Sequence, residues 1–291
     1  MKWKDNEQST NLEDRRRSGG KAVAVGGGGA LLILIVGLLL GMDPQQLSQQ
    51  ISQSQQGTGQ TGTSSGTEPT PRELEQRAFT ATILRFTETV WDEQFRKAGQ
   101  QYTPPRMVLF SEAVSTGGCG DAPSAAGPFY CPADRTVYLD PSFFEELEQN
   151  LGGSKAEFSQ AYVIAHEIGH HVQNLLGYSA LVDKKRRTLP KTEFNEWSVR
   201  LELQADFLAG VWAYHGQQKF RFVEAGDVEE AIASANAIGD DRLQKRSTGF
   251  TSPENYTHGT SQQRTRWFTR GLKSGNFGAL EELFSTPYEQ L

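Results

Sequence analysis

The sequence predicts an α+β domain of 220 residues that follows a single transmembrane helix. Three observations predict this organisation. Residues 22–42 form an uninterrupted apolar run, residues 43–71 are mostly small and polar, and residues 72–291 contain a strand pattern among several helical patterns. The chain therefore divides into an N-terminal tail, an anchor, a linker and one domain large enough to bury a substantial core.

The anchor is predicted from the sequence AVAVGGGGALLILIVGLLLGM at 22–42, which has no charged side chain. At ~1.5 Å per residue, a helix of this length crosses the ~30 Å hydrocarbon core of a bilayer. We therefore expect residues 22–42 to lie in a lipid bilayer. In the following linker, 43–71, 25 of 29 residues are Gln, Ser, Thr, Gly or Pro, so too few apolar groups are present to offset the entropy of ordering them.

The orientation in the membrane is predicted from basic residues. Six precede the apolar run and none follows it until Arg72; they are Lys2, Lys4, Arg15, Arg16, Arg17 and Lys21. Because basic flanks stay in the cytoplasm, we expect a cytoplasmic tail at 1–21 and an exported domain, periplasmic or extracellular, at 72–291. A cleaved signal peptide is the alternative, but GLLLGMDPQ offers neither an A-x-A-like cleavage site nor a lipid-accepting Cys.

The charge of the domain excludes one class of partner. Residues 72–291 carry 23 basic and 29 acidic side chains, which accounts for the entire net charge of -6. Nucleic acid binding needs a basic surface to meet the phosphates, so we expect no nucleic acid partner.

The two cysteines lie in a loop that regular backbone pairing cannot hold together. Cys119 and Cys131 are separated by 12 positions in the Gly- and Pro-rich segment GGCGDAPSAAGPFYCP. An exported domain meets oxidising conditions, so we expect a disulfide between them. Zinc binding by the two thiolates is the alternative, but it lacks two further ligands nearby.

The strongest chemical signal lies on a predicted helix at 155–176, where apolar residues recur at steps of three and four. Ser154 and Glu157 are expected to form a capping box at its start. The helix carries an HExxH sequence: His166 and His170, one turn apart, can reach one metal ion, with Glu167 beside them.

Two further residues of this helix bear on the predicted metal site. Gly169 costs the helix ~1 kcal/mol, which indicates that another group approaches closely there. His171 points away from the direction of the two motif histidines and is not expected to bind the metal.

The third metal ligand is expected from a second helix at 193–212. The pattern HExxHxxGxxH is not completed: Gln173 stands at the glycine position, and no His follows at the required spacing. Glu202 and Asp206 lie one turn apart on the second helix, and we expect Glu202 to bind the metal and Asp206 to accept a hydrogen bond from a ligating His.

These residues predict hydrolysis of an amide with one zinc ion per chain. A zinc ion held by His166, His170 and Glu202 lowers the pKa of water, and Glu167 takes its proton as the water attacks a carbonyl and returns it to the leaving amine. His258, with Tyr256 nearby, is the candidate for stabilising the oxyanion, although a role as an ordinary surface histidine was equally compatible with the pattern.

A predicted strand and one further histidine complete the sequence features of the domain. Residues 135–140 alternate like a strand and precede a predicted helix at 141–150. If that strand lies at a sheet edge, a peptide could pair with it; the alternative is an internal strand. His215 is explained as a favourable charge at the C-terminus of the second helix.

Six segments together resemble the bacterial neutral zinc metallopeptidases, a family of membrane-anchored zincins. They are Trp3 with NLEDRRR at 11–17, GPFYCP at 127–132, HEIGHHVQNLLG at 166–177, ELQADFLAGVW at 202–212, IGDDRLQ at 238–244 and HGTSQQR at 258–264. The resemblance implies a zincin fold, with a small sheet beside the HExxH helix, a mostly helical C-terminal lobe and a cleft between them. It also favours a catalytic role for His258, with Asp240 and Asp241 either orienting it or ending a helix that starts near 227.

The resemblance implies a peptidase that acts on proteins or peptides outside the cytoplasm. The alternative is a non-catalytic envelope module with a structural zinc site, for which the basic run at 184–187 could be a docking patch. Glu167 favours the enzyme, because a structural site gains nothing from a carboxylate at the open position of the metal.

Overall fold

A computed structural model describes residues 1–17 and 68–291. The predicted membrane span at 22–42 and nearly all of the predicted linker lie outside these residues. Within the described ranges, no helix combines the length and the apolar character needed to cross a membrane. The described residues form a mixed α+β fold that is mostly helical with a small sheet, as the sequence predicts.

The main sheet has four short strands in the order β1 (Leu12–Asp14), β2 (Arg106–Leu109), β6 (Thr136–Leu139) and β5 (Phe129–Cys131). The first three run parallel, and β5 pairs antiparallel with β6. The strand predicted at 135–140 is therefore β6, and it is internal. The edge strands of the sheet are β1 and β5.

The two faces of the sheet are buried by different layers. Met107 and Leu109 point into the large core formed with the helices. Val108, the residue between them, joins a small cluster with Val114. Val114 belongs to a hairpin of β3 (Ala113–Ser115) and β4 (Asp121–Pro123), which covers the second face.

Residues 1–17 are part of the folded domain, which differs from the separate tail that the charge pattern predicts. Strand β1 pairs with β2, and Leu12 is buried. The indole Nε1 of Trp3 donates to Glu157 Oε1 at 2.7 Å, and its ring packs edge-on against Phe79. A three-residue strand is too short for periodicity to reveal it.

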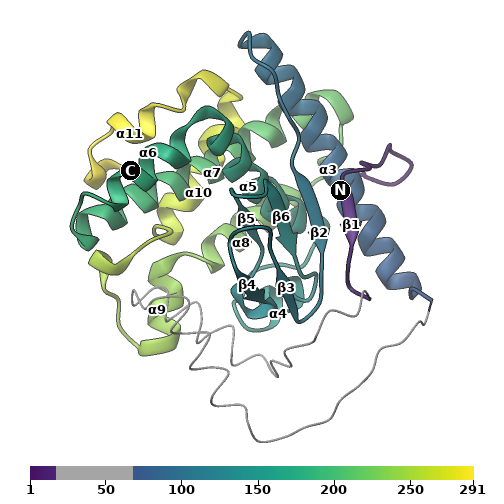
Figure 1. The fold of residues 1–291 in the computed structure, drawn as a ribbon, viewed down its shortest axis with the longest axis horizontal. Helices are drawn as coiled ribbons and strands as arrows, with labels where there is room; N and C mark the ends of the chain where they lie inside the picture. The colour runs from purple at the N-terminus through teal and green to yellow at the C-terminus, as the bar shows by residue number, and fades with distance from the viewer. Residues whose placement is uncertain (18–67) are drawn as a thin grey trace, which may run out of the picture.

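The helices pack against one face of the sheet and continue into a helical lobe (Figure 1). Their bounds are α3 (Pro71–Lys97), α4 (Phe143–Gln149), α5 (Glu157–Leu176), α6 (Tyr178–Arg186), α7 (Lys191–Phe220), α8 (Asp227–Ala237), α9 (Asp240–Thr248), α10 (Ser261–Ser274) and α11 (Glu282–Ser285). Figure 1 shows α3 alongside β1 and β2, while α6, α10 and α11 lie at the left of the view. The helices predicted at 141–150, at 155–176 and from 227 correspond to α4, α5 and α8.

Two details of the predicted helices are wrong. The Ser154–Glu157 capping box does not form: Ala156 precedes the first turn of α5 without a side-chain cap, and Glu157 accepts from the indole of Trp3 instead. The second helix continues to Phe220, eight residues beyond its predicted end. It continues because the ring of Phe220 stacks on Phe86, an anchor that helical periodicity does not show.

Candidate metal centre

The site forms where α5 crosses α7, and Gly169 permits the crossing. A Cβ atom at Gly169 would lie 3.1 Å from the backbone oxygen of Ala205 and 3.2 Å from its Cα. Such contacts are too close for most side chains, so glycine allows the two helix backbones to meet. This confirms the close approach that the sequence predicts at Gly169, and it brings the HExxH motif of α5 beside α7.

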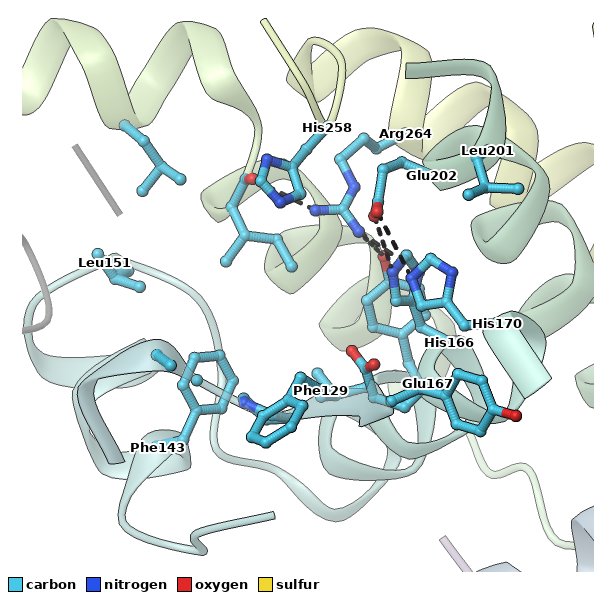
Figure 2. Close-up of a pocket in the computed structure, with 18 of the residues that line it drawn as sticks. Phe129, Phe143, Leu151, His166, Glu167, His170, Leu201, Glu202, His258 and Arg264 are labelled. Atoms are coloured by element: carbon cyan, nitrogen blue, oxygen red, sulfur yellow. Dashed lines mark hydrogen bonds and ion pairs between the residues drawn. The ribbon is translucent and has the colours of Figure 1, made fainter. Parts of the chain in front are cut away.

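His166, His170 and Glu202 meet at this crossing. Their candidate ligand atoms all lie within 4.8 Å of one another. The Nε2 of His166 is 3.2 Å from Glu202 Oε2, and the Nε2 of His170 is 3.5 Å from Glu202 Oε1 (Figure 2). The structure therefore brings together the three residues that the sequence predicts as metal ligands.

The opposite nitrogen of each ring has its own partner. The Nδ1 of His166 lies 2.9 Å from Asp206 Oδ1, as predicted, and the Nδ1 of His170 lies 2.8 Å from Gln173 Oε1. Both acceptors favour a proton on Nδ1, so in the neutral ring that binds a metal the lone pair of Nε2 is directed at the site. Two imidazole nitrogens and a carboxylate with such supporting contacts fit zinc.

Charge at the site also suits a cation. Burial by itself would lower the pKa of His170, but the Glu202 carboxylate outweighs burial and raises that pKa to about 9. Burial would raise the pKa of Glu202, but the two histidines hold it well below its usual value. An anionic carboxylate between two imidazoles is therefore stable here, and it favours positive charge at its centre.

A buried arginine, which the sequence did not reveal, supports Asp206. Arg264 of α10 donates through Nε to Asp206 Oδ2 at 2.8 Å, and the hydroxyl of Tyr162 donates to Oδ1 at 2.5 Å. Burial would raise the pKa of Asp206, but Arg264 and His166 lower it to about 2. Arg264 lies in the HGTSQQR segment, where an arginine among polar residues is ordinarily interpreted as exposed.

Glu167 lies beside the ligands in a cavity of about 450 Å³. Only 8% of its surface is exposed, and burial raises the pKa of its carboxyl. Figure 2 shows the Glu167 carboxylate between the ligand histidines and Phe129. A carboxylate with a raised pKa at this position can accept and return a proton.

His258 lines the same cavity from the loop before α10. Asp240 fixes this loop: its Oδ2 accepts from the backbone N–H groups of Thr257 and His258, both at 2.7 Å, and of Gly259 at 3.1 Å. Asp240 Oδ1 lies 3.2 Å from His258 Nδ1, which leaves Nε2 for a substrate. Burial lowers the pKa of His258, but Asp240 outweighs it and the net shift is upward.

Asp241 and Tyr256, which were associated with His258 from the sequence, have other roles in the structure. Asp241 accepts from the backbone N–H of Ser261 at 2.7 Å, so of the two neighbouring aspartates only Asp240 orients the histidine. Both begin α9 and do not end a helix. Tyr256 is buried in the main core and does not line the cavity, because its ring packs inward from the loop.

Comparison with known proteins identifies the family. The family described as "Putative neutral zinc metallopeptidase" matches residues 1–282. The chain belongs to this family. The uncharacterized protein YpfJ of Escherichia coli (strain K12) is 44% identical over 288 residues, covering 95% of this chain and 96% of that protein. The uncharacterized protein Rv2575 of Mycobacterium tuberculosis is 45% identical over 184 residues, covering 60% of this chain and 61% of that protein. No solved structure matches.

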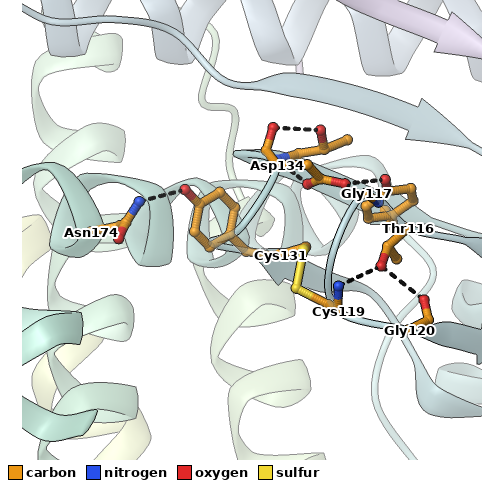
Figure 3. The surroundings of a disulfide bond; sticks show 10 residues. Thr116, Gly117, Cys119, Gly120, Cys131, Asp134 and Asn174 are labelled. Carbon is orange, nitrogen blue, oxygen red and sulfur yellow. Dashed lines mark hydrogen bonds between the residues drawn. A yellow bond between two sulfur atoms is a disulfide. The ribbon is translucent and has the colours of Figure 1, made fainter. Parts of the chain in front are cut away.

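In this family member the predicted disulfide is present. Cys119 and Cys131 are bonded, with their Cα atoms 5.9 Å apart (Figure 3). Cys131 ends the edge strand β5, and Cys119 belongs to the turn between β3 and β4. The disulfide therefore fastens this turn to the strand that borders the cavity.

The two histidines outside the site have structural partners. His171 is fully buried, with Nε2 2.7 Å from the carbonyl oxygen of Thr103 and Nδ1 3.0 Å from the hydroxyl of Tyr130. Both ring nitrogens are thus occupied, so His171 links α5 to β5 and is not placed to bind the metal; burial lowers its pKa to about 4. His215 lies inside α7, not at its end, and contacts the carbonyl oxygen of Gly275 after α10.

Proposed function

We propose that the protein is a zinc-dependent peptidase that hydrolyses peptide bonds in proteins or peptides outside the cytoplasm. The observation that carries this proposal is the place of Glu167: its buried carboxylate lines the same cavity as His166, His170 and Glu202. A purely structural metal site has no use for such a carboxylate.

The reaction depends on proton transfer by Glu167. When bound, a zinc ion supplies Lewis acidity that polarises a carbonyl and makes water easier to deprotonate. Glu167 takes a proton from the attacking water, and burial suits it to this role because the raised pKa lets it hold the proton. Glu167 then gives the proton to the leaving amine nitrogen.

His258 stabilises negative charge that develops on the carbonyl oxygen. Figure 2 shows it across the cavity from Glu167. With 39% of its side chain exposed, it is accessible to a substrate, and Asp240 holds it in place. A donor that is positioned in advance stabilises the transition state without a cost of reorganisation during the reaction.

The edge strand β5 offers a place for the peptide backbone. It is last in the order of the sheet, and its residues Phe129 and Tyr130 line the cavity. An extended peptide can add to such an edge as a further strand, which would lay a scissile carbonyl beside the metal ligands. Its sequence pattern made β6 the first candidate for this role, but β6 lies inside the sheet, so we assign the role to β5.

The disulfide supports a location outside the cytoplasm, because such bonds persist in oxidising compartments. The activity is tested with the full-length chain in detergent. We expect cleavage of an unfolded protein in the presence of zinc, loss of cleavage with a chelator, and recovery when zinc is restored. Cleavage that is indifferent to the chelator would refute metal dependence, and no cleavage of any substrate by zinc-loaded protein would favour the non-catalytic alternative.

A further inference from the structure

The cavity has two chemically different halves. All the charged side chains that line it belong to the catalytic half: His166, Glu167, His170, Glu202, His258 and Arg264. The cavity is also lined by six large apolar side chains, which we call the apolar recess: Phe129, Phe143, Leu151, Val163, Ile238 and Leu243. Figure 2 shows Phe129, Phe143 and Leu151 across the cavity from the metal ligands.

The walls of the apolar recess are held in place from behind. Leu151 is 1% exposed, Leu243 is 5% exposed and Phe143 is 9% exposed, and all three belong to the main core. Phe143 also packs edge-on against Phe144, with ring centroids 5.7 Å apart. Because these side chains are already fixed by packing, the recess needs little rearrangement to accept a ligand.

We propose that the apolar recess selects substrates with a large apolar side chain, such as Leu, Phe or Met, next to the bond to be cleaved. The inference rests on the proposed peptidase function and adds its substrate preference. Glu167 lies between the recess and the metal ligands, so a side chain held in the recess places an adjacent carbonyl beside Glu167.

The chemistry of the apolar recess sets the expected preference. Burying an apolar side chain is favourable in proportion to its area, and each buried methylene raises kcat/KM by about 4-fold. A charged side chain would lose its hydration without gaining a partner among the six lining residues. We expect Leu or Phe to exceed Ala by about 100-fold in kcat/KM, and Asp and Lys to be poorer than Ala.

The test uses the full-length, zinc-loaded protein and peptides that differ at a single residue beside the cleaved bond. Leu, Phe, Ala, Asp and Lys are compared by kcat/KM at each side of that bond. Binding of the same peptides to the Glu167→Gln protein is measured in parallel by fluorescence anisotropy. Ratios between peptides do not depend on the fraction of active protein, so partial unfolding cannot imitate a preference.

A filling variant examines the recess directly. Ile238→Phe reduces the available space and should shift the preference from Phe towards Ala, in cleavage and in binding. The matched control is Leu181→Phe on α6, at a residue that is 38% exposed and does not line the cavity, and its ratios should equal those of the wild type.

The outcomes separate this inference from the proposed function. Cleavage without any preference for apolar residues would overturn the inference and leave the peptidase function intact. Absence of cleavage together with preferential binding of Leu and Phe peptides would support the recess and refute the enzyme. Absence of any preference in both measurements would overturn the inference.

A different observation carries a second inference, about the N-terminal residues. Ser9 Oγ and Asn11 Nδ2 donate to the buried carboxylate of Glu88 at 2.6 and 2.7 Å. Arg16 Nη2 donates to the backbone oxygen of Glu73 at 2.9 Å, and Arg17 forms an ion pair with the Glu73 side chain. Residues before position 18 are therefore held against helix α3, which follows position 67, by hydrogen bonds and an ion pair.

We infer that residues 1–17 and 68–291 occupy the same compartment. A single crossing of the bilayer between them would place β1 and its partner β2 on opposite sides, where their pairing could not form. The basic residues that indicate a cytoplasmic tail have another explanation: Arg15 pairs with Glu13, and Arg16 pairs with Asp14.

Labelling of single cysteines in intact cells tests this inference. Lys4→Cys and Arg96→Cys place a thiol at side chains that are 66% and 70% exposed, and both native cysteines are held in the disulfide. A membrane-impermeant maleimide should label both variants or neither, with lysed cells as the control for reactivity. Labelling of one variant while the other is protected until lysis would overturn the inference.

Discussion

Asp206 and Arg264 form a buried ion pair directly behind His166, one of the three candidate metal ligands. The Nε of Arg264 lies 2.8 Å from Asp206 Oδ2, and its Nη2 lies 3.1 Å from Oδ1, the oxygen that also faces His166 Nδ1. Close packing of α7 against α10 makes this contact, since a Cβ at Gly271 would overlap the backbone oxygen of Phe207. Through Arg264 and Asp206, helix α10 therefore helps to orient His166, although α10 supplies no candidate metal ligand itself.

Removal of this arginine should weaken both the fold and the site. Arg264→Met leaves a buried carboxylate without its counter-charge, which costs about 3–5 kcal/mol of stability. The loss of support for His166 should also weaken zinc binding by about 10–100-fold. Chemical denaturation and zinc titration measure the two effects, and Arg266→Met, at an exposed position of the same helix, is the control. Equal stability and equal affinity in both variants would contradict this account.

The helix crossing at Gly169 should not tolerate a branched side chain. Gly169→Val would force its side chain against the backbone of Ala205 and push α5 away from α7. We expect a loss of about 1–3 kcal/mol from overpacking, together with reduced zinc per chain because Glu202 moves away from the histidines. Thermal unfolding and metal analysis test this expectation. Unchanged melting temperature and full zinc content would show that the crossing does not depend on glycine.

His258 should affect turnover more than metal binding. His258→Ala removes the proposed donor to the oxyanion, so kcat should fall by about 10²–10³-fold while zinc content remains one per chain. Loss of zinc in this variant, or an unchanged kcat, would contradict the role of His258.

The pH profile tests the link between Asp240 and His258. Burial lowers the pKa of His258, but the Asp240 carboxylate outweighs burial and the net pKa is raised. The protonated ring therefore persists to higher pH in the wild type. Activity should therefore decline as pH rises through this raised pKa. In Asp240→Asn the decline should begin at lower pH, while the acidic side of the profile stays in place. Profiles that coincide on the basic side would refute the coupling.

The disulfide should stabilise the domain without contributing to the chemistry. Cys119→Ser removes the cross-link that closes the loop before β5, and we expect a loss of about 2–4 kcal/mol in the free energy of unfolding. Denaturation with and without a reductant measures it. Reduction should lower the stability of the wild type to that of the variant and leave the variant unchanged; a wild type unaffected by reduction would contradict the prediction.

Most residues of the site that the sequence predicted lie within one helical turn of another; His258 is the exception, and only the family resemblance favoured it. His166, Glu167 and His170 follow from one motif, and Glu202 follows from its spacing to Asp206 on the next long helix. Such spacings have a fixed meaning on a helix surface, whatever the tertiary structure.

Features that depend on packing between distant segments could not be predicted in this way. Arg264 reaches Asp206 only because α7 and α10 meet, and Gln173 supports His170 from a position where the sequence shows only that the extended HExxHxxGxxH pattern is not completed. The three residues of β1 carry too little pattern to reveal a strand, and the place of β5 at the edge depends on strand order. Trp3 was noticed only through family resemblance, although its indole contact with Glu157 explains the missing helix cap.

The central claim, that Glu167 acts as the base beside a zinc ion held by its neighbours, is tested most directly by Glu167→Gln. Zinc per chain and the rate of peptide cleavage are measured on the same full-length preparation. Because the amide retains the shape of the side chain but cannot take a proton, we expect one zinc per chain and a rate lower by about 10²–10⁴-fold. One zinc per chain with a rate equal to that of the wild type would contradict the account.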